Sequence, residues 1–136
     1  MTQLSDASER TAVEDSEHAL ISSRRVEGTP VYNRGGDKLG SIHSVMIGKR
    51  SGKVAYALLS FGGFLGIGEN VHPVPWDVLD YDPGRDGYVV DLTREQLENA
   101  PSFRVDEADR PQERSRDELV YSYYGQLPWW GSAPPF

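Results

Sequence analysis

The sequence of 136 residues contains no cysteine, which excludes a disulfide framework, a thiolate nucleophile and a sulfur-ligated metal. It also lacks a run of about 18 apolar residues, the length that a membrane-spanning helix needs. The first residues, MTQLSDASERTAVEDSEHAL, have neither the basic nor the apolar segment of a secretory signal. We therefore expect a soluble, cytoplasmic protein with no membrane insertion.

Positive charge is scarce, with 14 lysines and arginines against 21 aspartates and glutamates and a net charge of −7. A protein that binds nucleic acid usually gains affinity from clustered cations that contact phosphates. Nucleic acid is therefore a disfavoured partner. The length allows one small domain with tails, because a core of ordinary size needs roughly 100 residues.

The N-terminal segment is acidic and poor in large apolar residues. Burial of so few apolar side chains cannot offset the entropy that is lost when a chain is ordered. Residues 1–19 are therefore predicted to be a disordered acidic tail. Its acids are Asp6, Glu9, Glu14, Asp15 and Glu17, against the single base Arg10.

Short apolar runs separated by turn residues begin near residue 20 and predict an all-β domain. Two of these runs are KLGSIHSVMIG and KVAYALLSFG. The separators at residues 33–37, 49–52 and 82–87 contain residues that are typical of hairpin turns. Five or six short strands would leave open edges unless the sheet curls on itself, so we expect a small barrel.

A short helix is predicted in LTREQLENAP, after the last strand. Thr93 and Gln96 have the spacing of a capping box, and Pro101 ends the helix.

The C-terminal part begins with a mostly charged stretch, residues 104–116, which is predicted to be a linker. Residues 117–136 are rich in tyrosine and tryptophan, and they are too apolar to be left wholly in water. A candidate helix spans Asp117 to Tyr124, with Gly125 as its stop. We expect this aromatic segment to dock on the barrel or on a sister subunit.

Three segments together resemble the PRC-barrel domain family. They are VEGTPVYNRGGDKLGSIHSVMIG, SGKVAYALLSFGGFLGIGENVHPVPWDVL and YVVDLTREQLENAPSF, and the resemblance covers residues 20–103. It implies a small six-stranded PRC-type barrel. Other members are the cytoplasmic domain of the photosynthetic reaction-centre H subunit, the C-terminal domain of ribosome maturation factors and stand-alone bacterial proteins, and none of them uses the barrel as a catalyst. The resemblance to a stand-alone member implies a binding or scaffolding role.

Motifs for cofactor or metal chemistry are incomplete. The glycines of FGGFLGIGEN are followed by Pro73 and Pro75 instead of a helix, so a nucleotide loop is disfavoured. In DYDPGRDG, a calcium loop that started at Asp82 would have Gly84 and Thr93 at its third and twelfth positions, where oxygen ligands are needed. A solvated hairpin turn is favoured there. We predict no catalytic residue, no cofactor and no metal ligand.

An enzymatic alternative stays open. A site for a small molecule or a metal at the barrel mouth would use His72, Trp76 and Asp77 first. A third hypothesis, which rests on family analogy, is an accessory role in assembling a ribosomal or photosynthetic complex.

Two groups of apolar side chains are the candidate protein contacts. Glycines allow the loop of residues 61–68 to double back and to present an apolar tip. The alternative is that this tip folds back as a lid on the barrel. We predict a non-enzymatic binding module that is a homo-oligomer and contacts an unknown protein partner. The predicted contact residues are Phe64, Leu65, Ile67, Tyr121, Tyr124, Trp129 and Trp130.

Overall fold

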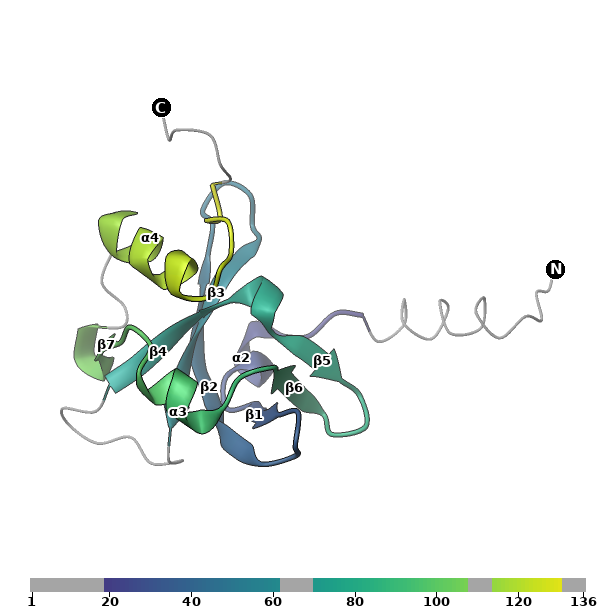
Figure 1. Cartoon of the computed structure of the whole chain (residues 1–136). Coiled ribbons are helices and arrows are strands. Elements are labelled where there is room, and N and C mark those ends of the chain that lie inside the picture. The colour runs from purple at the N-terminus through teal and green to yellow at the C-terminus, as the bar shows by residue number, and fades with distance from the viewer. Residues whose placement is uncertain (1–18, 62–69, 108–113, 131–136) are drawn as a thin grey trace, which may run out of the picture.

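The computed structural model describes residues 19–61, 70–107 and 114–130 (Figure 1). The predicted acidic tail, residues 1–19, therefore lies outside the described residues except for Ala19. The elements are α2 (Ser23–Val26), β1 (Pro30–Asn33), β2 (Lys38–Ile47), β3 (Val54–Phe61), β4 (Asn70–Pro75), η1 (Trp76–Val78), β5 (Asp80–Asp82), β6 (Gly87–Val90), α3 (Arg94–Glu98), β7 (Phe103–Arg104), η2 (Val105–Glu107) and α4 (Arg114–Tyr123).

The strands form one sheet in the order β5-β6-β1-β2-β3-β4-β7. Neighbours are antiparallel except β1 and β6, which pair in parallel from Val31↔Tyr88 to Asn33↔Val90. The all-β class is thus confirmed. The described part of the chain contributes seven strands instead of the expected six, and β5 and β7 are the two edges of this open sheet. The additional strand, β7, forms because Phe103 is buried and brings the chain back along the start of β4.

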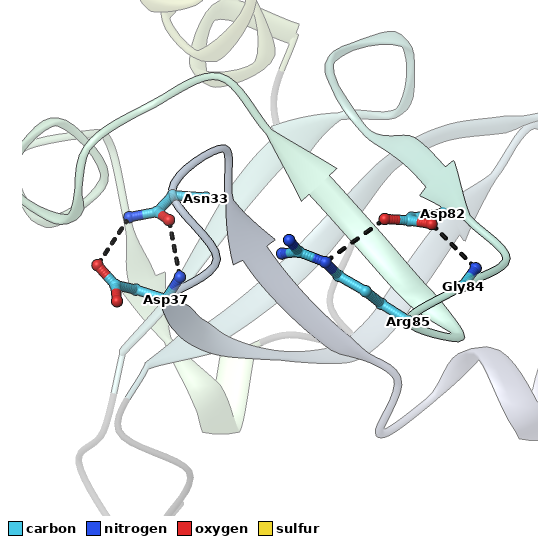
Figure 2. Close-up of polar contacts among 5 residues, drawn as sticks. All are labelled: Asn33, Asp37, Asp82, Gly84 and Arg85. Carbon is cyan, nitrogen blue, oxygen red and sulfur yellow. Dashed lines mark hydrogen bonds and ion pairs between the residues drawn. The ribbon is translucent and has the colours of Figure 1, made fainter.

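All three predicted hairpin turns are confirmed, since each joins antiparallel neighbours. In the β1–β2 turn, the Asp37 backbone N–H donates to Asn33 Oδ1 over 2.9 Å (Figure 2). In the β5–β6 turn, the Gly84 N–H donates to Asp82 Oδ1 over 2.9 Å, and Arg85 lies 3.5 Å from the other carboxylate oxygen (Figure 2). The Asp82 carboxylate therefore stabilises its own turn.

The predicted capping box is present at the start of α3. Thr93 Oγ1 accepts the Gln96 backbone N–H over 3.0 Å, and Gln96 Oε1 accepts the Thr93 N–H over 2.8 Å. The helix buries Leu97 in the core.

The helix α4 begins at Arg114, three residues before the predicted start at Asp117. Its first three residues, 114–116, lie in the stretch of residues 104–116 that is predicted to be a linker. The same stretch also contains η2. The end of α4 at Gly125 was predicted. Gly125 has a φ of 66°, and the Gln126 N–H donates to the carbonyl of Tyr121 over 2.9 Å, which is the Schellman arrangement.

Both faces of β3 are buried. Successive strand residues point to opposite faces, so Ala57 and Leu59 belong to one core cluster and Tyr56 and Leu58 to another. The other members of the first cluster are Val26, Val31, Leu39, Ile42, Val74, Leu79, Tyr88, Val90 and Leu97. The second also contains Val71, Phe103 and Tyr121.

The strand β4 lies next to the edge strand β7, which pairs only with its first two residues. After Val71, its pairing among the described strands is with β3 alone. Pro73 and Pro75 lack an N–H and so leave no donor unpaired on the outer side. The helix α4 packs beside this strand (Figure 1).

Candidate protein-binding groove

A groove of about 1040 Å³ lies between the end of the β2–β3 hairpin and the segment that follows α4. In Figure 1 this segment runs beside the hairpin after the helix ends. The hairpin forms one wall with residues 46–51 and 53–55, and residues 126–129 form the other. The floor consists of Tyr56, Pro75, Trp76, Asp77, Asp117 and Tyr121.

Three exposed apolar side chains lie together in the walls of the groove. Ile47 is 50% exposed, Leu127 is 70% exposed and Trp129 is 51% exposed. Large apolar side chains that gather at one concave surface mark an interaction site more strongly than the same residues scattered singly. The groove is therefore the candidate contact surface.

Two tyrosines make the floor rigid. The rings of Tyr56 and Tyr121 meet edge to face with centroids 6.4 Å apart. The Tyr121 hydroxyl donates to the Ala55 carbonyl over 3.0 Å, and the Tyr56 hydroxyl donates to Asp117 Oδ1 over 3.3 Å. Burial raises the pKa of both phenols well above the usual 10, so they remain neutral donors.

Asp117 joins the floor to the C-terminal wall. Its side chain is buried, and desolvation raises the pKa of the carboxyl above its usual 3.8. Hydrogen bonds from Trp129 and Tyr56 oppose that rise, as do the nearby charges of Arg114 and Arg116. One buried carboxyl thus contacts β3 and the segment after α4 at the same time.

Arg114 supports the same wall through its planar guanidinium. The guanidinium carbon lies 4.3 Å from the ring centroid of Trp130 and 5.4 Å from that of Trp129. The two indoles are themselves perpendicular, with centroids 5.2 Å apart. Stacking of a cation on aromatic faces contributes about 0.5–1 kcal/mol at an exposed site. Trp129 is thereby held with one side toward the groove.

The rim of the groove is basic. Lys49, Arg50 and Lys53 are exposed and belong to the turn between β2 and β3. Asp77 is the exposed acid of the lining. The local charge at the rim is therefore opposite in sign to the net charge of the chain, −7.

The predicted contact residues are not all in the groove. Tyr121 and Trp129 line it, and Trp130 contacts the Trp129 ring edge to face. Tyr124 packs against the first core cluster, on the other side of the helix end. The predicted apolar tip of Phe64, Leu65 and Ile67 lies outside the described residues, in the segment that connects β3 with β4.

Ile47, Leu127 and the basic rim were not predicted from the sequence. Lys49 and Arg50 were interpreted only as turn residues. The available signal was Ile47, the last apolar residue before this basic turn, because an apolar side chain at the end of a hairpin is exposed when no loop covers it.

The three residues suspected of catalysis are not gathered at one site. His72 is buried, packs edge to face on Phe61 at 4.8 Å, and donates to the Ala100 carbonyl. Trp76 and Asp77 line the groove, and Trp76 packs on Tyr88 at 5.2 Å. Within the described ranges, no group of three or more His, Asp or Glu side chains is placed to hold a metal ion.

No helix among the described residues combines the length and the apolar character that crossing a membrane requires.

The fold and the groove define a small β-sheet domain with a helical C-terminal extension packed on it. The family model of the PRC-barrel domain matches residues 19–97, which is more than half of the chain. The protein therefore belongs to the PRC-barrel domain family. The match ends within α3, so α4 and the C-terminal wall of the groove lie beyond it.

A relative with detectable similarity is an uncharacterized protein of Deinococcus radiodurans. The two sequences are 29% identical over 93 residues, which cover 68% of this chain and 33% of the relative. The chain thus matches about a third of that protein's length.

Proposed function

We propose that the protein is a non-enzymatic, cytoplasmic protein-binding module and that the groove is its contact surface. The observation that carries this proposal is the convergence of Ile47, Leu127 and Trp129 on one groove. Protein interfaces typically have an apolar, aromatic centre and a charged rim, which is the distribution found here.

The rigidity of the groove supports binding. Tyr56 and Tyr121 are fixed by hydrogen bonds, and Trp129 is held by Asp117 and Arg114. A preformed surface binds with a smaller loss of side-chain entropy than a mobile one. Aromatic residues in such a centre often contribute a large share of the binding free energy.

The family context points in the same direction. The C-terminal wall is formed by residues beyond the family match, where α4 and residues 126–129 pack on the sheet. Packing of this extension on the sheet creates a surface that the matched region alone does not have. The partner is a second copy of the chain or another protein, including a component of an assembling complex.

The test is selection from a random peptide library displayed on phage, with the full chain as bait. Selected peptides are then titrated against Leu127→Ser and, as a matched control, against Leu119→Ser. Both leucines are exposed, at 70% and 67%, but Leu119 lies on α4 away from the groove. We expect Leu127→Ser to raise Kd about tenfold, because an interface anchor contributes more than about 1 kcal/mol.

The control variant is expected to keep Kd within about twofold of the parent, since surface substitutions away from a contact have small effects. If no selected peptide distinguishes Leu127→Ser from Leu119→Ser, the groove is not the contact surface and the proposal is wrong.

A further inference from the structure

The charges of the basic rim do not stabilise the described fold through ion pairs. In the described part of the chain, Lys49, Arg50 and Lys53 form no ion pair; the cations that pair there include Arg34, Arg85 and Arg104. Three cations on one short turn repel one another. An anionic ligand relieves that repulsion.

The turn that carries these cations is well fixed. The Gly48 N–H donates to the Lys53 carbonyl over 2.8 Å, and the Lys53 N–H donates to Ser51 Oγ over 3.1 Å. The Gly52 N–H donates to the Gly48 carbonyl over 2.9 Å. The backbone under Lys49, Arg50 and Lys53 is therefore ordered before a ligand arrives, which lowers the entropy lost on binding.

In the part of the chain that the structure describes, neither acid of the groove forms an ion pair with a rim cation. Asp117 is buried and accepts hydrogen bonds from Tyr56 and Trp129. Asp77 lies on the floor beside Tyr121, on the element that follows β4. The three cations lie on the hairpin wall next to Ile47. A ligand bound there would therefore contact positive charge beside an apolar surface.

Resting on the proposed function, we propose that the groove binds an extended segment of a partner protein in which an apolar or aromatic anchor is flanked by acidic residues. The anchor packs on Ile47, Leu127 and Trp129, and the acids pair with the rim. A basic segment is rejected, because like charges at an interface are destabilising and suppress wrong partners.

The probe is a fluorescein-labelled peptide in which a Leu-Phe pair is flanked on both sides by glutamates, measured by fluorescence anisotropy with the full chain. Two further peptides test its parts: one has lysine in place of glutamate, and the other has serine in place of Leu-Phe. We expect the acidic peptide with the Leu-Phe anchor to bind more tightly than either.

The rim is tested with Lys49→Gln/Arg50→Gln/Lys53→Gln. The matched control is Arg24→Gln/Arg25→Gln/Lys38→Gln, which removes the same charge from exposed positions outside the groove. We expect the rim variant to raise Kd about tenfold and the control to change it less than about twofold, because three direct ion pairs act together while distant charges are screened. Added salt should weaken binding to the parent and have little effect on the rim variant.

The inference is overturned if the lysine peptide binds as well as the glutamate peptide, or if the two triple variants behave alike. Circular dichroism melting of both variants checks that they are folded. If library peptides depend on Leu127 but carry no excess of acids, this inference fails while the proposed function stands. If no peptide depends on Leu127, the proposed function itself fails.

Discussion

Tyr56 on β3 donates its hydroxyl to Asp117 on α4 over 3.3 Å, although 61 positions separate the two residues in the sequence. This contact lies beneath the groove, where the carboxyl also accepts a hydrogen bond from Trp129. The sheet, the helix and the C-terminal wall therefore share one buried polar centre, and the shape of the groove depends on it.

Removal of the Tyr56 hydroxyl should destabilise the protein. Tyr56→Phe leaves a buried carboxyl with one donor fewer, and we expect a loss of about 1–2 kcal/mol in the free energy of unfolding. The measurement is urea denaturation followed by circular dichroism. Tyr32→Phe, whose hydroxyl is not part of this contact, is the control. Equal effects of the two variants would contradict the assigned role of the hydrogen bond.

Acidification should destabilise the protein through His72. Burial lowers the pKa of this imidazole below its usual 6.5, against the opposing effects of the Ala100 carbonyl and of Glu98. As the pH falls below about 6.5, the unfolded state therefore binds more protons than the folded state. The free energy of unfolding decreases as the pH falls further, until the pH reaches the lower pKa of His72 in the folded state.

Denaturation midpoints measured at several pH values from 8 to about 5.5 test this prediction. We expect His72→Gln to flatten the dependence and the control His43→Gln to preserve it. A parent protein whose stability does not change over that range would show that His72 does not supply the effect.

Gly40 is expected to tolerate no side chain. A Cβ atom at this position of β2 would overlap the backbone carbonyl of Ser60 on β3. Gly40→Ala should therefore cost about 1–3 kcal/mol, because the paired strands must move apart. The thermal midpoint of Gly40→Ala is compared with that of Gly35→Ala, where a Cβ meets only the Asn33 side chain at an ordinary 3.4 Å. Similar midpoints would rule out the predicted clash.

The segment between β3 and β4 is predicted to carry an oligomer interface. The double variant Phe64→Asp/Leu65→Asp should lower the mass that light scattering reports and leave the monomer folded, because charges at an apolar interface oppose association. An unchanged mass with a large loss of thermal stability would instead support the alternative that this segment is a lid on the domain.

The local features of the fold could be predicted from the sequence. The capping box of Thr93 and Gln96 and the stop at Gly125 depend on residues within one or two turns of chain, and so do the hairpin turns. The family could be predicted as well, since three segments carried its pattern.

The groove could not be predicted, because it depends on contacts between distant parts of the chain. Alternation in β3 identifies two faces, but only the position of α4 shows that Tyr56 is covered by Tyr121. The two-residue strand β7 is too short to show alternation. The exposure of Ile47 likewise depends on where residues 126–129 lie.

The parallel pairing of β1 with β6 has a consequence for the folding kinetics. The hairpins of β2, β3 and β4 join strands that are neighbours in the sequence. Val31 and Tyr88, in contrast, pair although all three of those strands lie between them in the sequence. Closing a longer loop costs more entropy, and contacts between distant residues slow folding. During synthesis, β1 therefore has no parallel partner until β6 has emerged from the ribosome.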